Sequence, residues 1–376
     1  MYQTGSISSP GTCIQGKLLQ YVLGPDPDGP IVPLQERIVT QCGVPSILTG
    51  LDGSLQLFVA GQADYPSSPS YAPWPLSPLC LHHRPESAAW QLTRLPDAVD
   101  GIQRFVSGIP SAVANERTML AYFNGGQLLE YESLPETEWS VSAIPVPDIV
   151  VDANPVAILA GDSVFVLSAP RGEALLLCKR RLDSAAWRFV DLGAEASVGS
   201  FAGDPAVAEF GGKLHVFVCA AAAVQEPFEL WDFLVDLDGS VTEAYAVSRD
   251  ACRREGALPL TVAGTPTVLV THRGLQVLVR SAAGRLVEFH STGGERWETS
   301  PVSQGPVEGN SGAVLGGDGS SMAYASDRMG YLTEFRETDG VWRERRISHV
   351  CGEAERWPRP VVCARQVRVF DLEIAV

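Results

Sequence analysis

Residues 284–297 read GRLVEFHSTGGERW, and two other stretches of the chain follow the same pattern. They are GQLLEYESLPETEW at residues 126–139 and GYLTEFRETDGVW at residues 330–342. In each, an apolar run with an acidic residue at its centre leads through a polar turn to a tryptophan. Runs rich in Leu, Val, Phe and Tyr between Gly, Asp and Pro turns are typical of short antiparallel strands. The pattern therefore predicts an all-β protein made of repeated units.

Two further apolar runs precede these stretches, and most units open with a proline. The openings are Pro45, Pro110, Pro155, Pro205, Pro266, Gly312 and Pro360. The second runs are LQLFVA from residue 55, MLAYFN from 119, VFVLSA from 164, LHVFVC from 214, LQVLVR from 275, MAYAS from 322 and VRVFDL from 367. The fourth run begins with tryptophan in five units, at Trp90, Trp139, Trp187, Trp297 and Trp342. The 376 residues thus divide into seven units of about 54 residues.

Four-stranded antiparallel units bury both of their faces when they pack around an axis, so the sequence predicts a seven-bladed β-propeller in one domain, residues 1–376. The last blade is expected to be split. Its inner strands, 361–364 and 367–375, are C-terminal, and its outer strands, 17–23 and 31–39, are N-terminal. Removing either end should therefore unfold the ring. The predicted blades are 44–98, 109–148, 154–194, 204–248, 265–304, 311–348, and 359–376 together with 15–40.

The composition excludes several classes of partner. Hydrophobic residues make up 45% of the chain and charged residues 19%, with a formal net charge of −16. Such a charge disfavours nucleic acid and anionic membranes as partners. No apolar run reaches the roughly 20 residues that span a bilayer, and residues 1–13 lack the features of a signal peptide. We expect a soluble protein, cytoplasmic or secreted with its signal peptide already removed.

Long insertions are predicted on one face of the ring, at 61–78, 96–108, 220–227, 248–264 and 348–359. Links from first to second strand and from third to fourth strand, on the other face, are short. Long loops on a rigid scaffold usually carry function. The insertions hold or adjoin aromatic and polar residues that suit an apolar or planar organic ligand; these are Tyr65, Tyr71, Trp74, Trp231, Arg253, Arg254, His349 and Trp357.

The proline-led first strands and the stretches at 126–139, 284–297 and 330–342 resemble the fungal fucose-specific lectin family of β-propellers, over essentially the whole chain. In that family, an arginine from a second strand, a glutamate from a third strand and a neighbouring aromatic residue bind the sugar between blades. The glutamate position is kept at Glu130, Glu288 and Glu334, with Asp232 and Gln20 as polar variants. The arginine position holds Gln56, Leu120, Phe165, His215, Gln276, Met322 and Arg368. Since no blade combines both, we interpret the glutamates as solvated strand residues.

The resemblance extends to lectin-like hetero-Diels–Alderases of fungal tropolone–sesquiterpene pathways, which implies a cyclase without metal or cofactor. Such an enzyme holds two apolar substrates, a quinone-methide-type diene and a humulene-type olefin, in near-attack geometry and polarises a developing oxyanion. We assign Arg254, His349 and Tyr71 as catalytic, and Tyr65, Trp74, Trp231, Arg253, Trp357 and Arg368 as substrate-binding. The alternatives are a lectin with diverged carbohydrate sites and a protein-interaction platform. Paired carboxylates of a glycosidase are a further alternative without a local motif.

Histidine and cysteine positions add smaller predictions. His215 and Asp232 fall on neighbouring strands, where they form either a structural hydrogen bond or an acid–base dyad. Cys80, Cys178 and Cys363 lie in apolar strands and are predicted to be buried thiols. Two pairs, Cys13 with Cys42 and Cys219 with Cys252, are candidate disulfides. No CxxC pair indicates structural zinc.

Overall fold

The structure of the protein is a computed structural model, and its described part consists mainly of β-strands. The described residues are 16–23, 31–33, 39–40, 45–49, 54–62, 76–84, 90–99, 102–134, 137–146, 154–169, 174–223, 226–254, 260–294, 296–316, 318–327, 331–346, 359–363 and 366–374. For residues 16–40 and 359–374 only the backbone enters the description below.

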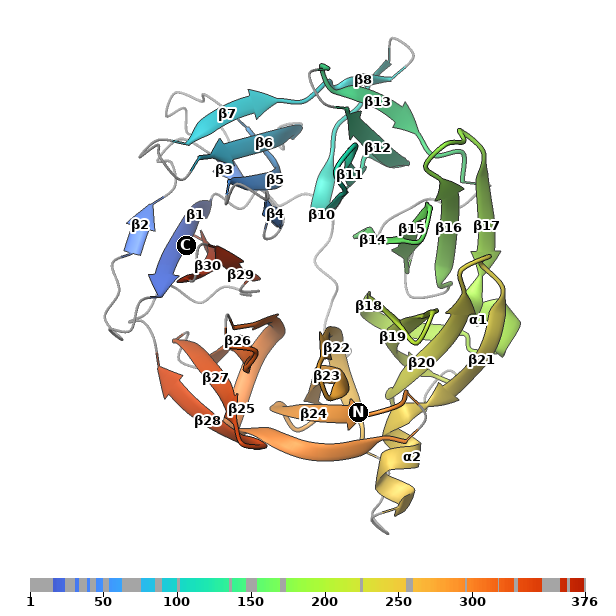
Figure 1. The fold of residues 1–376 in the computed structure, drawn as a ribbon, viewed down its shortest axis with the longest axis vertical. Helices are drawn as coiled ribbons and strands as arrows, with labels where there is room; N and C mark the ends of the chain where they lie inside the picture. Colours follow the sequence, from blue (N-terminus) through green and yellow to red (C-terminus); the bar gives the residue numbers. More distant parts are fainter. Residues whose placement is uncertain are drawn as a thin grey trace, which may run out of the picture.

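Antiparallel four-stranded units follow one another along the chain and stand around a common centre (Figure 1). Three of them are separate sheets, formed by β10 (Ser107–Ala114), β11 (Met119–Asn124), β12 (Leu128–Ser133) and β13 (Ser140–Ala143); by β14 (Val156–Ala160), β15 (Ser163–Ser168), β16 (Leu176–Arg181) and β17 (Trp187–Asp191); and by β18 (Ser200–Phe210), β19 (Lys213–Ala221), β20 (Glu229–Asp236) and β21 (Val241–Ala246). The predicted four-stranded repeat is confirmed in these sheets.

Two neighbouring units share one strand. The sheet contains β22 (Val262–Thr271), β23 (Gly274–Ser281), β24 (Arg285–Ser291), β25 (Glu298–Leu315), β26 (Ser321–Asp327), β27 (Leu332–Thr338) and β28 (Val341–Arg346). The first part of β25 pairs with β24 and its later part with β26, so one strand of 18 residues ends one unit and begins the next. The sequence analysis predicted two separate sheets here. They are joined because no insertion interrupts the extended backbone between them.

The first unit also departs from the prediction. It contains β4 (Ser46–Thr49), β5 (Leu55–Gln62), β6 (Ser77–His83) and β7 (Gln91–Arg94), with β3 (Val39–Thr40) on the same edge of β5 as β4. Val39 pairs with Gln62 of β5, so it does not belong to the last blade, where it was predicted. β5 extends beyond the end of β4, and β3 continues the innermost position along it.

The two ends of the chain meet in one sheet, as the sequence predicted. β1 (Gly16–Leu23) pairs along its whole length with β30 (Gln366–Ile374), from Gly16 opposite Ile374 to Leu23 opposite Val367. The sheet order is β2 (Ile31–Pro33), β1, β30, β29 (Arg359–Cys363). The N-terminal strands therefore lie at the outer side and the C-terminal strands at the inner side of this sheet (Figure 1).

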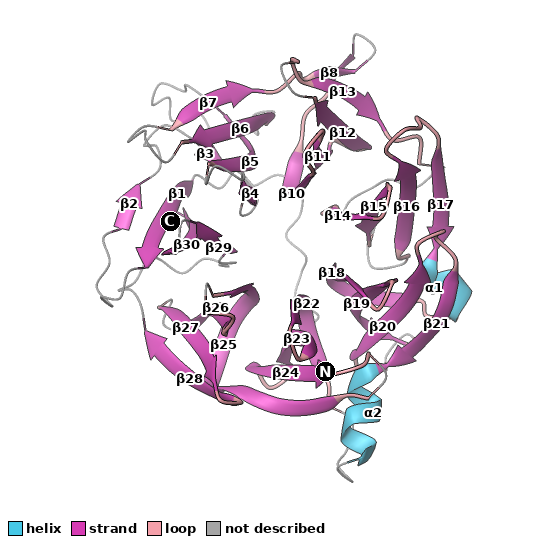
Figure 2. Ribbon diagram, in the orientation of Figure 1, coloured by secondary structure: helices cyan, strands magenta, loops and turns pink. Residues whose placement is uncertain are grey.

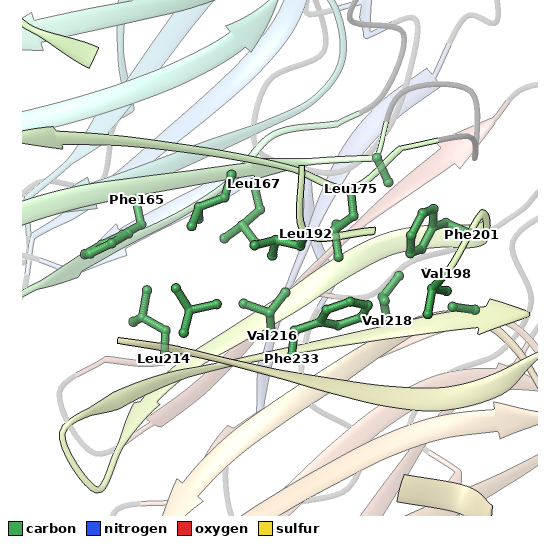
Figure 3. Close-up of a cluster of buried hydrophobic side chains, with 14 of the residues drawn as sticks. Phe165, Leu167, Leu175, Leu192, Val198, Phe201, Leu214, Val216, Val218 and Phe233 are labelled. Carbon is green, nitrogen blue, oxygen red and sulfur yellow. The ribbon is translucent and has the colours of Figure 1, made fainter. Parts of the chain in front are cut away.

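The core lies between successive sheets, and strand alternation explains it. Along β19, Leu214, Val216 and Val218 belong to a cluster shared with the preceding sheet, whereas Phe217 and Cys219 belong to a cluster shared with the following sheet. Successive side chains of a strand point to opposite faces. Second strands packed on both faces therefore need unbroken apolar runs, as the sequence has. Figure 3 shows the first of these clusters, with Phe165, Leu167 and Leu175 facing Leu214, Val216 and Phe233.

Hydrogen bonds connect the first strands of neighbouring units near the centre. The Ile109 amide donates to Asn154 Oδ1 at 2.6 Å, and the Thr265 amide donates to Asn310 Oδ1 at 2.8 Å. Gly264, with φ of +86°, makes the second contact possible, because a Cβ atom there would lie 2.5 Å from Asn310 Oδ1. The repeated proline-led start of the first strand thus carries contacts between units.

The links that lead from a fourth strand to the next unit hold the additional elements of the fold. They are the β8–β9 hairpin (Ala98–Val99 and Ile102–Gln103), α1 (Leu192–Ala196) and α2 (Val247–Arg254). Both helices lie at the rim of the ring (Figure 2). Links from first to second strand are much shorter, as at 161–162, 211–212 and 272–273. In the described residues, links from fourth strands are longer than links from first to second strands, as predicted. The second-to-third links at 125–127 and 282–284 are short, contrary to the prediction, and the helices were not predicted.

Candidate functional site

The third strand of each unit from β4–β7 to β25–β28 places one residue directly opposite the second strand, beside the next unit. These pairs are Cys80 with Phe58, Glu130 with Tyr122, Leu177 with Leu167, Asp232 with Phe217, Glu288 with Leu278 and Glu334 with Tyr324. The acidic members are the positions predicted from the resemblance. They are at most 5% exposed, so their interpretation as solvated residues is wrong.

Glu130 is enclosed by residues of its own unit and the next. Its Oε2 accepts a hydrogen bond from the Tyr122 hydroxyl at 2.8 Å and another from Arg180 of β16 at 3.0 Å. The Arg180 guanidinium lies over the ring of Trp187, 5.5 Å from its centroid. Burial raises the pKa of Glu130, while the charge of Arg180 opposes that shift. We call this set of four residues the closed junction.

Asp232 forms a second enclosed network. Its Oδ2 lies 2.8 Å from His215 Nδ1, as the sequence predicted, and 3.2 Å from the Tyr245 hydroxyl. That hydroxyl donates to the Gly294 carbonyl at 2.7 Å and accepts the Trp297 indole N–H at 3.1 Å. The side chains of His215 and Asp232 are 5% and 0% exposed. Because a substrate cannot reach groups buried to this degree, the geometry favours the structural hydrogen bond over the acid–base dyad.

Glu288 repeats the contact with a tryptophan of the next unit. Its Oε2 accepts hydrogen bonds from the Ser300 hydroxyl at 2.6 Å and from the Trp342 indole at 2.9 Å. A buried carboxylate needs such donors. The tryptophans that begin fourth strands therefore serve in part to hold one unit against the preceding one.

Glu334 carries an arginine–carboxylate pair within its own unit. Arg345 lies 3.3 Å and Arg336 lies 3.7 Å from the carboxylate, and the Tyr324 hydroxyl donates to it at 3.0 Å. Arginines therefore meet the glutamates here and at Glu130, although no second-strand arginine does so among the described residues. The arginines come from third and fourth strands, whereas the prediction considered second strands.

The second-strand positions assigned to the family's arginine hold other contacts. His215 binds Asp232, and Gln276 Nε2 donates to Glu337 Oε2 at 2.8 Å. In β15 this position is Phe165, as assigned; it lies two residues before Leu167 and packs in the cluster shared with the following sheet.

A cleft of about 610 Å³ lies where the first and second units meet. Its lining residues are Thr93, Arg94, Leu95, Pro96, Asp97, Glu138 and Trp139. Here the third-strand position holds Cys80 in place of an acid, and the thiol is buried with Phe58 in the cluster against which Trp139 packs. The Phe58 and Trp139 rings meet edge to face at 5.6 Å. We call Cys80, Arg94, Asp97, Glu138 and Trp139 the open junction.

The polar groups of the open junction are held by local contacts. Arg94 donates to Ser77 Oγ at 2.7 Å and lies 3.2 Å from Asp97 Oδ2. The backbone of Asp97 is fixed by the Arg104 amide, which donates to its carbonyl at 2.6 Å. The side chains of Arg94 and Asp97 are 61% and 31% exposed, so both remain accessible from the cleft.

Comparison with known proteins relates the backbone to solved structures. No family model matches the chain, and no curated protein is similar to it in sequence. The BP39L lectin from Burkholderia pseudomallei matches with a TM-score of 0.63 and 12% identity, over 85% of this chain and 89% of the lectin. The Cps50 (Swd1) β-propeller domain from Myceliophteria thermophila matches with a TM-score of 0.52 and 8% identity, over 90% of this chain and 99% of that domain.

The fold is a β-propeller. A protein of unknown function from Dyadobacter fermentans also matches in backbone structure, with a TM-score of 0.50 and 14% identity over 98% of this chain and 100% of that one. The TM-scores show the fold, and at identities of 8–14% the activity of the β-propeller has to be argued from its own sites.

Most of the predicted site residues lie outside the described part of the β-propeller. Tyr65, Tyr71, Trp74, His349 and Trp357 are in this group. Arg253 and Arg254 are the last two residues of α2, and Arg368 lies in β30 opposite Val22 and Val361; their side chains are not described. The catalytic assignment of Arg254, His349 and Tyr71 stays a prediction.

Trp231 is the predicted substrate-binding residue whose side chain is described. It is half-buried on β20, packs against the cluster between two sheets and lies 6.3 Å from the Phe233 ring. Its indole Nε1 is buried and has no hydrogen-bond partner among the described residues. The ring of Trp231 therefore packs against this hydrophobic cluster.

The cysteines correct one disulfide prediction. Cys219 and Cys252 are both free, buried thiols, so the bridge predicted between them is wrong. Burial among apolar side chains raises the pKa of the Cys219 thiol to about 12. Cys80 and Cys178 are buried thiols as predicted. Cys363 lies in β29, where side chains are not described, and the pair Cys13 and Cys42 lies outside the described residues.

The described residues also bear on metal binding and on membrane insertion. No three His, Cys, Asp or Glu side chains in this part of the chain gather as a metal site requires. No helix there is long and apolar enough to cross a membrane.

Arg94, Asp97 and Glu138 were not predicted from the sequence as a group. A signal was available in the stretch 126–139, where an acidic residue directly precedes the tryptophan. The corresponding residues before Trp187, Trp297 and Trp342 are Ala186, Arg296 and Val341; the full set also includes Ala89 before Trp90.

Proposed function

We propose that this β-propeller binds carbohydrate in the open junction. The observation that carries the proposal is the cleft in which a half-buried tryptophan, an arginine and two carboxylates meet. Its volume falls within the range of ligand sites. Indole rings offer an apolar surface to the C–H groups of a sugar ring, and guanidinium and carboxylate groups form charge-assisted hydrogen bonds with hydroxyls.

The contrast with the other unit boundaries supports this location. At the closed junction, Arg180 forms an ion pair with the carboxylate of Glu130, and Trp187 lies against Arg180. At the next acidic positions, Asp232 is hydrogen-bonded to His215, and Glu288 accepts a hydrogen bond from Trp342. These polar groups are already bonded to other residues of the protein and are not available to a ligand. In the open junction, Arg94 and Asp97 face a cleft.

A structural neighbour adds support of a weaker kind. BP39L, whose backbone resembles this one, is named a lectin. The likeness concerns fold, and we extend it to carbohydrate binding only together with the cleft. The finer ligand class of the resemblance, a fucose-type sugar, belongs to this proposal as the first sugar to test.

We infer further that the ring has seven blades in one domain. The shared strand β25 counts as the fourth strand of one blade and the first of the next, because its two parts pair with β24 and β26 separately. The sheet that joins β1 and β30 then forms the last blade. On this count the predicted blade boundaries at 109–148, 154–194 and 204–248 each enclose one complete sheet or nearly so.

The cyclase function stays a prediction without an observation in the described residues to carry it. Its substrates, a tropolone-type diene and a humulene-type olefin, require a closed apolar pocket. The lining of the open junction contains three charged side chains, Arg94, Asp97 and Glu138, which suits hydroxyl groups better than a hydrocarbon.

Titration calorimetry with a panel of neutral monosaccharides and oligosaccharides, fucosides included, tests the carbohydrate proposal. Trp139→Ala should weaken the best ligand about thirty-fold, since a central tryptophan is worth about 2 kcal/mol in a binding site. Trp187→Phe, at the closed junction, is the matched control and should bind as the unchanged protein does. Failure of every sugar to bind, or equal binding by Trp139→Ala, would contradict the proposal.

A further inference from the structure

The charges that line the open junction are unequal. One guanidinium, that of Arg94, faces the carboxylates of Asp97 and Glu138, which leaves one negative charge in excess. Arg94 is engaged with Asp97 at 3.2 Å. Its positive charge is therefore largely neutralised before any ligand arrives.

Glu138 supplies the excess charge. It is exposed, and none of the described residues forms an ion pair with it. It follows a turn that is closed by hydrogen bonds between Leu134 and Thr137, in which the Thr137 amide donates to the Leu134 carbonyl at 3.1 Å and its hydroxyl at 3.0 Å. The carboxylate thus lies beside Trp139, directly after Thr137, which these hydrogen bonds hold.

The surroundings of the cleft add to this field. The formal net charge of the chain is −16. Tyr131, on the adjoining β12, is fully buried, and its hydroxyl has no hydrogen-bond partner among the described residues. Burial and then the charge of Asp97 raise the pKa of Tyr131, so this hydroxyl stays neutral and leaves the charge of the cleft unchanged.

We propose that the open junction selects sugars with a protonated amino group over neutral sugars, and neutral sugars over sugars with a carboxylate. This selectivity rests on the carbohydrate-binding function proposed above. An ammonium group beside both an indole ring and a carboxylate gains from cation–π attraction and from the ion pair. A carboxylated sugar meets the same excess charge with the opposite sign and is repelled.

The test uses three oligosaccharides of equal length: a fully deacetylated glucosamine trimer, its N-acetylated counterpart and a uronic acid trimer. At pH 6 and low salt, the full-length protein should bind the amino trimer about five-fold more tightly than the acetylated one, which corresponds to about 1 kcal/mol. The uronic acid trimer should bind most weakly. Raising the salt concentration should reduce the preference, because the pair is solvent-exposed.

The decisive readout is the ratio of the affinities for the amino and acetylated trimers. Glu138→Gln should reduce this ratio to about one, whereas Glu116→Gln, an exposed acid on another hairpin, should leave it unchanged. A ratio of one in the unchanged protein, or a ratio that survives Glu138→Gln, overturns the selectivity while carbohydrate binding stands. Loss of all three ligands together overturns the binding function itself. Equal affinity for trilysine would assign the site to amines without a sugar ring and would also overturn the proposal.

Discussion

The open and closed junctions occupy equivalent places between successive sheets and differ at the third-strand position that faces the next unit. At the closed junction this position is Glu130, which binds Arg180 of the next unit. At the open junction it is Cys80, which has no carboxylate to offer and is buried among apolar side chains. The neighbouring tryptophan, Trp139, then lines a cleft together with Arg94.

The difference teaches how a repeated unit specialises. A buried acid draws a donor from the next unit, because an unsatisfied carboxylate in the interior is costly. Arg180 donates such a hydrogen bond to Glu130, and Trp342 donates one to Glu288. Where the acid is absent, the polar residues at the boundary are available to a ligand. On this account, the buried acidic positions hold neighbouring units together, and the proposed binding falls to a different group of residues.

Breaking the closed junction should have the largest effect. Arg180→Met removes the charge that lowers the pKa of Glu130, so the pKa of this buried carboxyl rises further above its ordinary value of 4.5. A buried acid whose pKa is raised in the folded state destabilises that state at pH values above its ordinary pKa. The loss of stability should therefore grow as the pH rises from about 4 to 7. We expect a loss of about 3 kcal/mol in the free energy of unfolding at pH 7.

Urea unfolding at both pH values measures this loss. The double variant Glu130→Gln with Arg180→Met should recover most of it at pH 7, because it leaves no buried charge. A loss of the same size at pH 4 and pH 7 would contradict the assigned role of Glu130.

Converting the open junction into a closed one is the next test. Cys80→Glu places a carboxylate where Glu288 stands in its own unit, within the region against which Trp139 packs. The new carboxyl lies opposite Phe58, which offers no hydroxyl, so about 2 kcal/mol of stability should be lost at pH 7. Sugar binding should weaken about ten-fold as Trp139 becomes engaged. Cys178→Glu is the matched control and should lose stability without any change in sugar affinity.

The smallest effect separates the two kinds of tryptophan. Trp342→Phe removes the indole donor of buried Glu288, whereas Trp139→Phe removes an indole for which the described contacts give no acceptor. Both lose similar ring area, so the difference in unfolding free energy isolates the hydrogen bond. We expect Trp342→Phe to cost about 1 kcal/mol more than Trp139→Phe. Equal costs in thermal or urea unfolding would mean that the contact with Glu288 contributes no stability.

The repeat in the sequence was sufficient to predict the strands and the joining of the two ends in one sheet. Strands are determined by local alternation and turn residues, which the runs around Pro110, Pro155 and Pro205 display directly. The pairing of β1 with β30 follows from counting units. The shared strand β25 was not predicted, because the predicted blades end at residue 304 and begin again at residue 311, both within this strand.

The partners of the acidic residues could not be predicted in the same way. Glu130 and Arg180 are 50 residues apart, and their contact depends on the packing of two sheets. The family resemblance directed attention to second-strand arginines, whereas the structure supplies arginines from other strands. Arg94 and Asp97 lie around the end of β7, and Glu138 lies just before β13. Their meeting is a consequence of the ring, which no local motif encodes.

A crystal of the protein soaked with its best sugar tests the central claim most directly. The account predicts difference density for the sugar between Arg94 and Trp139, with the carboxylates of Asp97 and Glu138 within hydrogen-bond distance of the ligand. It also predicts that the Glu130–Arg180 pair stays intact without ligand beside it. Sugar density at the closed junction, or at the face that carries the long loops with none at the open junction, would contradict the account.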